Sequence, residues 1–237
     1  DRIVHLAALA GVRASINRAS DYVAVNLGGT VSVLDAARAA GVRHTVIIST
    51  SSVYGATARI PFVEDDPADQ PLAPYPATKR AAEVMAYSYV NLFAMPIAVV
   101  RLFSVYGPRG RPDMMPYQIA DSIAHGKPIT LFNGGNMHRD WTYVSDISAG
   151  IVGALDTPKG FGLYNLGRGE PVLMADFVRL LEGLIGKPAL IHDTPAPASE
   201  PPTTFADISR ARETFGYSPQ VPVTEGLQKF WAWFREQ

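Results

Sequence analysis

Hydrophobic residues in the first half of the chain fall into short continuous runs, separated by longer segments with a helical period. The runs predict strands at residues 3–8, 44–50 and 97–104. The longer segments predict helices at residues 21–40 and 75–93, each followed within a few residues by a glycine or a proline. Apolar runs without polar alternation are typical of parallel strands that helices cover on both faces. The pattern therefore predicts an α/β fold.

The pattern changes at about residue 107, where proline and glycine become frequent and the elements become shorter. Residues 193–202 predict a proline-rich loop, and residues 223–235 predict a short amphipathic helix. We expect residues 1–106 to form most of a parallel-sheet domain and residues 107–237 to form mainly a smaller mixed α/β lobe. Segments near 130–155 are expected to interleave with the first domain.

Composition narrows the classes of function. The net charge of −1 gives no sign of a nucleic-acid or membrane surface, and no apolar run approaches the roughly 20 residues of a membrane helix. The chain has no cysteine, and its five histidines lack the spacing of metal ligands. We expect a cytoplasmic protein that binds neither nucleic acid nor a membrane and holds no metal.

Tyr75 and Lys79 are the first candidate pair for chemistry. A spacing of four places both side chains on one face of the predicted helix. A tyrosine has an ordinary pKa of about 10, and a nearby ammonium favours the phenolate, which can accept a proton from a hydroxyl group. Ten tyrosines and five lysines also make this spacing easy to reach by chance, so the pair alone decides little.

A run of hydroxyl side chains forms the second candidate feature. Ser49, Thr50, Ser51 and Ser52 come at the end of the predicted strand 44–50. Ligands of open α/β sheets bind at the carboxyl ends of the strands, where these hydroxyls could orient a substrate beside Tyr75. The alternative is an ordinary solvated serine-rich loop.

Several motifs, taken together, resemble those of the extended short-chain dehydrogenases and cover nearly the whole chain in the same order and spacing. They are residues 5–8 (HLAA), Asn26 with Gly29 and Thr30, 49–55 (STSSVYG), 75–79 (YPATK), 101–108 (RLFSVYGP), 139–146 (RDWTYVSD) and 205–207 (FAD). The resemblance implies a Rossmann-like sheet in which Tyr75 is the catalytic base. It implies that Lys79 lowers the pKa of that base and holds the nicotinamide ribose, and that Thr50 is the catalytic hydroxyl.

The resemblance also implies NAD as the cofactor. Residues that would line its pocket are Leu6, Ala7 and Ala8, with Asn26 as a further candidate and Phe103 at the nicotinamide end. The family opens with a glycine-rich turn that holds the pyrophosphate, and residues 3–8 correspond to its fourth strand. We therefore expect a Rossmann-like sheet without its N-terminal β-α-β segments, roughly 70 residues of the family pattern.

The loop after Thr50 bears on the reaction. Relatives oxidise a sugar at C4 to a 4-keto intermediate, and the 4,6-dehydratases and decarboxylases then use carboxylic side chains at the next positions. Here those positions are Ser51 and Ser52, which do not exchange protons near neutral pH. This difference favours 4-epimerisation, with a dehydratase of unusual acid and base residues left as an alternative.

The substrate expectation comes from three stretches, residues 10–15, 107–114 and 135–140, that resemble UDP-glucuronate 4-epimerases most. The resemblance implies conversion of UDP-glucuronate to UDP-galacturonate, with these substrate-binding residues: Ser51, Ser52 and Ser104 with Arg13 or Arg111 for the carboxylate, Arg139 for the diphosphate, Phe132 for the uracil and Glu200 for the ribose. The arginines could also be ordinary solvated ion pairs. An epimerase of the neutral sugars UDP-glucose and UDP-galactose, or a nucleotide-sugar-binding fragment without catalysis, remains open.

Small side chains on the helices at 21–40 and 75–93 predict an assembly. Alanines on both helices permit close helix packing, and relatives pair these helices with their copies in a second subunit. We therefore expect a two-fold homodimer.

Overall fold

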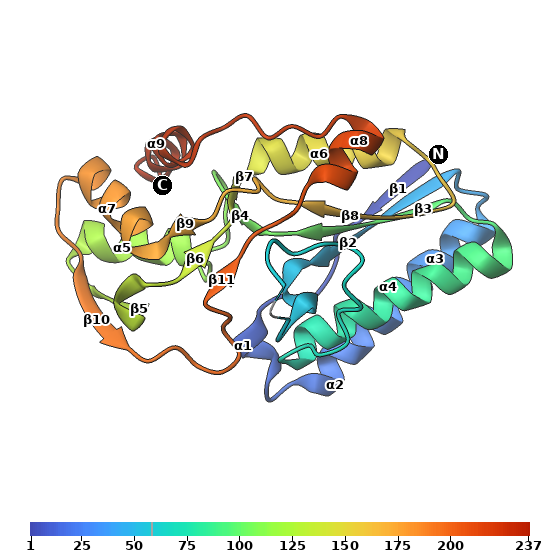
Figure 1. Cartoon of the computed structure of the whole chain (residues 1–237), viewed down its shortest axis with the longest axis horizontal. Helices are drawn as coiled ribbons and strands as arrows, with labels where there is room; N and C mark the ends of the chain where they lie inside the picture. The colour runs from blue at the N-terminus through green and yellow to red at the C-terminus, as the bar shows by residue number, and fades with distance from the viewer. Residues whose placement is uncertain (58) are drawn as a thin grey trace.

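Four parallel strands form the central sheet of the first lobe in the computed structural model, which describes residues 1–57 and 59–237. In spatial order they are β1 (Arg2–His5), β2 (His44–Thr50), β3 (Ile97–Leu102) and β8 (Phe161–Leu166). Every residue of β2 is buried, as its apolar run predicts. The carboxyl ends of the strands point toward the second lobe (Figure 1).

Helices cover both faces of this sheet (Figure 1). One face carries α3 (Gly29–Ala39) and α4 (Pro74–Phe93), and the other carries α6 (Val144–Asp156) and α8 (Ser209–Phe215). Separate hydrophobic cores fill the two interfaces, with Leu34 and Ala86 on the α3–α4 side and Val100 and Ala154 on the α6–α8 side. The predicted α/β fold is confirmed.

The second lobe is built from short mixed elements around its own core. Its helices are α5 (Met115–His125), α7 (Met174–Ile185) and α9 (Val223–Phe234), with a 3-10 turn η3 (Asn133–Gly135). Its strands are β4 (Ser104–Tyr106), β5 (Pro128–Phe132), β6 (His138–Arg139), β7 (Trp141–Tyr143), β9 (Val172–Leu173), β10 (Leu190–Thr194) and β11 (Thr203–Thr204). Aromatic side chains dominate this core, and Trp141 stacks on Phe177 at a centroid distance of 4.5 Å.

The two lobes interleave through α6, which overlaps the segments expected near 130–155, and through β8 and α8 further along the chain. Strand β5 pairs with β10 inside the second lobe. The chain returns to the first lobe with α6 and β8, because β8 completes the sheet beside β3, and it returns again with α8.

The helix expected at residues 21–40 consists of three parts. They are α2 (Ala19–Tyr22), a π-helical segment η1 (Val23–Gly28) and α3. The buried residue of the π-helical turn is Asn26, whose side-chain amide bonds the N–H and the carbonyl of Leu9 at 2.8 and 3.0 Å. Such widened turns occur often at functional sites. This one brings Asn26 against the chain that leaves β1.

The strand expected at residues 97–104 divides at Phe103. Strand β3 ends at Leu102 in the first sheet, and β4 begins at Ser104 and pairs with β7. The chain crosses between the two lobes at this point. A continuous apolar run gives no sign of such a change of partner, because both strands are largely buried.

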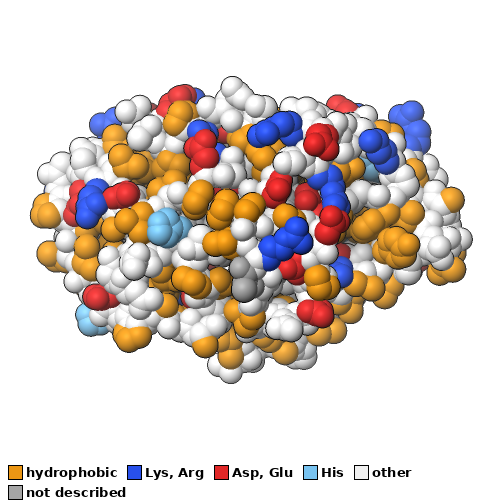
Figure 2. Space-filling view, viewed as in Figure 1, with side chains coloured by type: hydrophobic (Ala, Val, Ile, Leu, Met, Phe, Trp, Pro, Cys, Tyr) orange, Lys and Arg blue, Asp and Glu red, His pale blue; other side chains and the backbone are white. Residues whose placement is uncertain are grey.

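Charged side chains of both signs are interspersed on the face shown in Figure 2, which agrees with the net charge near zero. Within residues 1–57 and 59–237, no helix has the length and apolar character that crossing a membrane requires.

Candidate active site

Tyr75 lies in the first turn of α4, where a distant serine holds its backbone. Ala73 precedes the helix and has no side-chain group to cap it. Instead the Ser15 hydroxyl, in the short helix α1 (Val12–Ser15), accepts the N–H of Tyr75 at 3.0 Å and donates to the carbonyl of Val12 at 2.6 Å. This contact satisfies one of the free N–H groups of the helix end. The segment after β1 therefore fixes the position of the Tyr75 backbone, from which the phenol side chain extends.

The pKa of the Tyr75 phenol lies above its usual value, because burial raises it by more than a hydrogen bond with the Thr50 hydroxyl and the nearby Arg111 guanidinium lower it. The lowered pKa that the sequence predicted is not found in the protein alone. The sequence predicted Lys79 as the cation that lowers this pKa. In the structure Arg111 has that place, because the Lys79 side chain lies one helical turn further on, where its charge acts on His5.

The Lys79 residue is 3% exposed, and no hydrogen bond or ion pair of its ammonium is found among the described residues, although its nitrogen is not one of the fully buried polar atoms that lack a partner. Burial lowers the pKa of Lys79 to about 8, and the charge of Glu83 opposes this shift. A buried ammonium without a partner is costly unless a ligand supplies one. This lysine therefore fits the binding of a polar group that residues 1–57 and 59–237 do not provide.

The hydroxyl-rich turn after β2 is a 3-10 turn, η2 (Ser51–Tyr54), which Thr50 caps. The Thr50 hydroxyl accepts the N–H of Ser52 at 3.2 Å and lies 3.2 Å from the Ser52 hydroxyl. Ser49 does not join them, because its hydroxyl donates to Glu83 beneath the sheet edge. Gly55 ends the turn with φ +57°, and a Cβ there would overlap the carbonyl oxygen of Gln70. Three of the four expected hydroxyls thus remain at the site.

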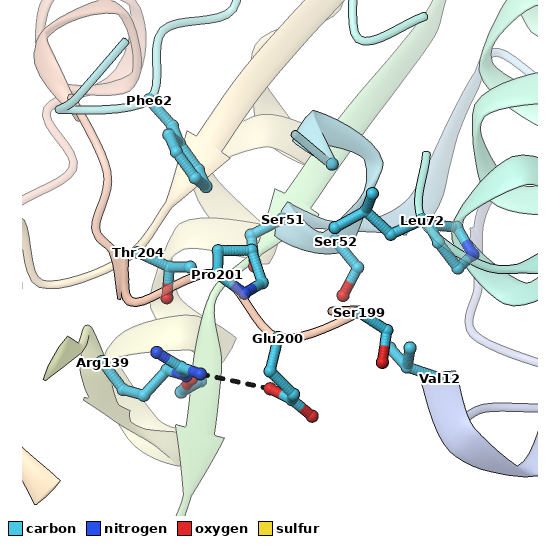
Figure 3. A pocket seen from close by; sticks show the side chains of 13 residues that line it. Val12, Ser51, Ser52, Phe62, Leu72, Arg139, Ser199, Glu200, Pro201 and Thr204 are labelled. Carbon is cyan, nitrogen blue, oxygen red and sulfur yellow. Dashed lines mark hydrogen bonds and ion pairs between the residues drawn. The ribbon is translucent and has the colours of Figure 1, made fainter. Parts of the chain in front are cut away.

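A cavity of about 110 Å³ joins this turn to the second lobe (Figure 3). Five of the predicted substrate residues line it: Ser51, Ser52, Ser104, Arg139 and Glu200. Phe62, Leu72 and Pro76 supply an apolar wall. The cavity therefore combines serine side chains with a charged pair.

The charged end connects both lobes. Arg139 donates to Glu200 at 3.1 Å, and the Arg13 guanidinium lies 3.8 Å from the other carboxylate oxygen of Glu200. Arg13 also lies over the ring of Phe132, with 5.4 Å between the guanidinium carbon and the ring centroid. Arg139, Glu200 and Phe132, which the resemblance assigns to the nucleotide, therefore lie close together although they are far apart in the sequence. Arg13, predicted as one of two candidates for the carboxylate, lies with them. A second hollow of about 610 Å³, lined by Arg13 and Phe132, adjoins them.

Arg111 has two roles in the structure. Its guanidinium forms a bidentate pair with Asp113 at 2.9 and 2.7 Å, the ordinary ion pair that the sequence left open. It also lies close enough to Tyr75 to lower the pKa of the phenol. Arg111 therefore lies near the Tyr75 phenol while it is paired with Asp113.

Leu6, Ala7 and Ala8 follow β1 at the carboxyl edge of the sheet, where the Leu6 side chain is 60% exposed and Ala7 is also exposed. This open edge, together with the unpaired Lys79 ammonium, suits a cofactor that lies across the strand ends.

Two of the predicted cofactor contacts, Asn26 and Phe103, are buried, and their contact with a cofactor stays a prediction. Asn26 is fully buried, and its amide bonds Leu9 and, at 3.1 Å, the Thr78 hydroxyl. Phe103 is 5% exposed and packs against Tyr54 and Phe62 at 6.4 and 6.1 Å, in the core under the site.

A parallel sheet with a Tyr-x-x-x-Lys helix, a hydroxyl beside the tyrosine and an open edge at β1 defines a dinucleotide-dependent enzyme that transfers protons and hydrogen at an alcohol carbon. The family model described as "NAD dependent epimerase/dehydratase family" matches residues 1–167. The chain belongs to this family, and NAD is its cofactor. The fold, the enzyme class and the cofactor predicted from the sequence are thereby confirmed.

Known relatives and solved structures agree with this assignment. The UDP-glucuronate 4-epimerase of Thermodesulfobacterium geofontis is 40% identical over 235 residues, which cover 99% of this chain and 72% of the relative. The crystal structure of a UDP-glucuronic acid 4-epimerase from Bacillus cereus, in complex with UDP-glucuronic acid and NAD, is 36% identical with a TM-score of 0.91, covering 100% of this chain and 76% of that one. A dTDP-glucose 4,6-dehydratase from Streptomyces venezuelae is 27% identical with a TM-score of 0.93, covering 100% of this chain and 74% of that one. The fold is thus shared by enzymes of different reactions, and the site residues must distinguish them.

Sequence reasoning missed residues that support the site from a distance. Ser15 holds the backbone of Tyr75, and Thr78 links Asn26 to the carbonyl of Tyr75 at 2.8 Å. Glu83 follows Lys79 by four residues, and Lys79 follows Tyr75 by the same spacing. That repeated spacing was a usable signal for Glu83, whereas no local pattern points to Ser15.

Proposed function

We propose that this protein is a UDP-sugar 4-epimerase of the cytoplasm that interconverts UDP-glucuronate and UDP-galacturonate through a 4-keto intermediate. One observation carries the proposal. The cavity next to the turn that Thr50 caps is lined by Ser51, Ser52 and Ser104, where elimination or decarboxylation would need a carboxylic acid. Hydroxyls can bind a sugar but do not exchange protons with it near neutral pH.

Tyr75 is the proposed base of the reaction. Its phenolate would accept the proton of the sugar C4 hydroxyl, which Thr50 would orient. The resulting phenol would return a proton to the C4 oxygen after the 4-keto sugar has rotated in the site. NAD, when bound, supplies the reversible redox chemistry at C4. Lys79 would donate hydrogen bonds to a ribose hydroxyl, which gives its buried ammonium the partner it lacks within the described part of the chain.

The nucleotide is proposed to bind at the charged end of the cavity. Arg139 is 14% exposed and would meet the diphosphate, with Arg13 nearby. Glu200 would then release Arg139 and bind the ribose. The Phe132 ring would stack on the uracil. Binding therefore requires the Glu200–Arg139 pair to open.

The carboxylate of a uronate is proposed to lie among the three serine hydroxyls, close to Arg111. Three hydroxyls can satisfy a carboxylate when water fills its remaining lone pairs. The guanidinium of Arg111 is fixed by Asp113 beside Tyr75, so its charge is available near the reacting end of the sugar. This arrangement favours a charged sugar.

Replacing Ser104 by alanine tests the uronate. The backbone N–H of Ser104 bonds the carbonyl of Asp140, and alanine keeps that bond, so the fold should be unchanged. We expect kcat/KM for UDP-glucuronate to fall about ten- to a hundredfold, because part of the substrate charge is left unpaired. For UDP-glucose the loss should be much smaller, since a neutral hydroxymethyl group can turn toward water.

Ser148→Ala is the matched control, because that hydroxyl is exposed on α6 and bonds only the carbonyl of Val144. It should leave both substrates unaffected. Equal losses on the two sugars in Ser104→Ala would contradict the uronate and favour the second candidate, an epimerase of UDP-glucose and UDP-galactose, whose hydroxymethyl group the same serines could bind. A protein that binds nucleotide sugars without turnover would show no conversion of either.

A two-fold homodimer is proposed through α3 and α4, which lie side by side on the outer flank of the first lobe (Figure 1). The outer surface here is apolar: Val84, Tyr87 and Leu92 on α4 are 54%, 57% and 68% exposed. We expect light scattering of the full-length protein to give twice the monomer mass, and Leu92→Arg to shift it toward monomer. Val152→Arg, at a residue 53% exposed on α6, should leave the dimer intact. A monomer in the wild-type protein would rule the assembly out.

A further inference from the structure

Glu83 is a buried carboxylate that the proposed mechanism does not use. It lies in α4, four residues beyond Lys79 and eight beyond Tyr75, and its side chain is 1% exposed. Helical periodicity therefore places all three side chains along one face, toward the ends of β2 and β3.

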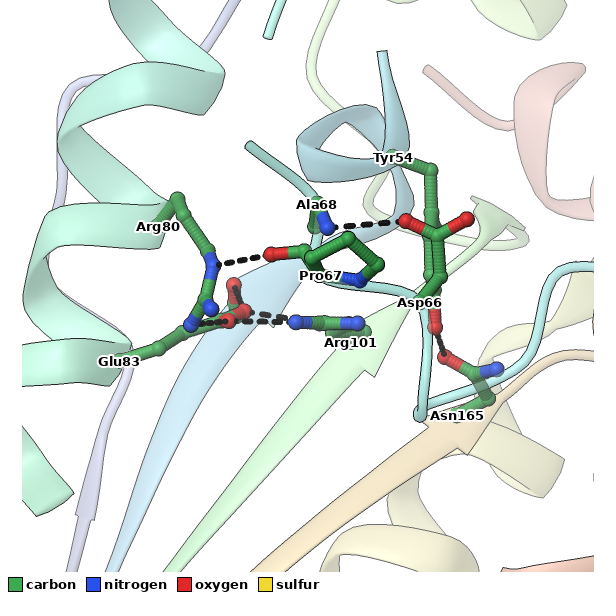
Figure 4. A network of polar contacts seen from close by, with 9 residues as sticks. Tyr54, Asp66, Pro67, Ala68, Arg80, Glu83, Arg101 and Asn165 are labelled. Atoms are coloured by element: carbon green, nitrogen blue, oxygen red, sulfur yellow. Dashed lines mark hydrogen bonds and ion pairs between the residues drawn. The ribbon is translucent and has the colours of Figure 1, made fainter. Parts of the chain in front are cut away.

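The carboxylate of Glu83 receives donors from three elements (Figure 4). One oxygen accepts the Ser49 hydroxyl of β2 at 2.5 Å and the Arg101 Nε of β3 at 3.0 Å. The other accepts Arg101 Nη2 at 2.7 Å and Arg80 Nη1, from the same helix, at 3.2 Å. Ser49 and Arg101 are register partners in the sheet, so a single carboxylate joins α4 to both strands one residue before Thr50 and Leu102.

Arg101 extends this network to the hydroxyl-rich turn. It is fully buried, and its guanidinium carbon lies 4.7 Å from the centroid of the Tyr54 ring, at the end of that turn. The Tyr54 hydroxyl donates to Asn165 of β8 at 2.7 Å. The helix that carries Tyr75 and Lys79, the turn that carries Ser51 and Ser52, and the strands beneath them thus meet at one ion pair.

Stability alone does not account for this arrangement. Buried ion pairs can often be replaced by apolar residues of similar volume at little cost, because desolvation offsets much of their attraction. What apolar residues do not provide is the fixed direction of four hydrogen bonds, which sets both the height and the rotation of a helix on its sheet.

We propose that Glu83 is a positioning residue of the reaction centre. It fixes α4 on the ends of β2 and β3, so that the Tyr75 and Lys79 side chains are aligned with the Thr50 hydroxyl. This inference rests on the proposed epimerase function and deepens it. The charge of Glu83 has a second effect on the same helix. Two titratable side chains face Lys79: His5 from β1 and Glu83. Arg101 and Arg80 lie on the far side of the Glu83 carboxylate. Of these groups, only Glu83 carries a charge that favours the ammonium form of Lys79.

Glu83→Gln tests the proposal, because glutamine keeps the size and one acceptor while removing the charge. We expect kcat of the full-length enzyme to fall at least about tenfold through misalignment of Tyr75, with KM and the binding of UDP within about twofold. The alkaline limb of the kcat–pH profile should move about one pH unit lower, since Lys79 loses the charge that favours its ammonium. The titration of Lys79, followed by nuclear magnetic resonance of ¹⁵N-lysine-labelled protein and assigned with Lys79→Arg, should move in the same direction.

Two further variants separate this role from a general loss of structure. Glu225→Gln removes a carboxylate from an exposed pair with Lys229 on α9 and should change neither kcat nor the titration of Lys79. The double variant Glu83→Met, Arg101→Met removes both buried charges, so Lys79 should titrate close to its wild-type pH while kcat stays at least about tenfold low.

Wild-type kcat in the folded double variant, or in Glu83→Gln, would overturn the proposal. If wild-type protein converts no UDP-sugar, the proposed function fails. The inference is then decided by the Lys79 titration in Glu83→Gln: the expected shift supports it and an unchanged titration overturns it.

Discussion

Replacing Tyr75 by phenylalanine is expected to lower turnover at least about 100-fold. The Tyr75 phenol, which lies next to Thr50, is the proposed acceptor of the C4 hydroxyl proton, and phenylalanine has no such group. Phenylalanine does keep the aromatic ring, whose centroid lies 6.1 Å from that of Tyr22. The Ser15 contact uses the backbone N–H and is also kept. The structure should therefore be unaffected, and the loss should appear in kcat. Initial rates with saturating nucleotide sugar, together with calorimetric titration with UDP, give the comparison.

UDP binding should be unchanged in this variant, because Arg139 and Phe132 belong to the second lobe. Tyr87→Phe is the matched control, since Tyr87 lies on the same helix and is 57% exposed. It should retain full activity. More than about a tenth of wild-type turnover in Tyr75→Phe would mean that another group removes the proton.

Lys79→Met is expected to act in opposite directions on activity and on stability. Activity should fall at least about 100-fold, because the ammonium that would hold the cofactor ribose is lost. The free energy of unfolding without NAD should rise by about 2–3 kcal/mol at neutral pH, because burial lowers the pKa of Lys79 from 10.5 to about 8 and methionine removes that buried charge. Few substitutions at a structural lysine would raise stability, so the sign is informative.

The stability gain has a defined dependence on pH. The folded-state pKa of Lys79 lies below the unfolded value, so folding penalises the protonated lysine. The advantage of Lys79→Met should be full below pH of about 8 and should disappear as the pH approaches about 10.5, where the lysine is neutral in both states. Urea denaturation of both proteins across this range gives the difference directly.

Lys127→Met serves as the control, because the Lys127 side chain is 60% exposed. It should alter stability little at any pH in this range. A lower unfolding free energy in Lys79→Met at neutral pH would show that Lys79 is stabilised by the fold, and the proposed ligand role would lose its main support.

The sequence predicted the sheet well where the signal is local. The strand at 44–50 matches β2 residue for residue, and the helix at 75–93 differs from α4 by one residue at its start. Continuous burial in β2 leaves a clear apolar run, and Phe93 is followed by Ala94 in a left-handed conformation before Pro96. Both signals come from the residues themselves.

Other parts of the fold depend on contacts that no local pattern records. The π-helical turn η1 forms around Asn26, whose amide bonds Leu9 far back in the chain. The break at Phe103 arises because Ser104 pairs with Trp141 in another sheet. In each case tertiary partners decide between conformations that the local sequence would allow equally.

The candidate site divides in the same way. Residues that carry chemical groups, such as Tyr75, Ser52 and Arg139, could be identified from motifs. The structure places Ser52 and Arg139 in one cavity and Tyr75 next to Thr50, which caps the turn that carries Ser52. Ser49 and Phe103 belong to the same motifs but point into the interior, since neighbouring residues of a strand face opposite sides. Motifs identify a segment, and only the fold shows which side of it meets the ligand.

Proton nuclear magnetic resonance of UDP-glucuronate mixed with the full-length protein and NAD tests the proposed 4-epimerisation. We expect conversion to UDP-galacturonate until both epimers are in equilibrium, with the carboxylate retained and no water eliminated. UDP-glucose under the same conditions should be converted much more slowly. A decarboxylated or 4-keto-6-deoxy product, or faster conversion of UDP-glucose than of UDP-glucuronate, would contradict the assignment of the serine-lined cavity to a uronate.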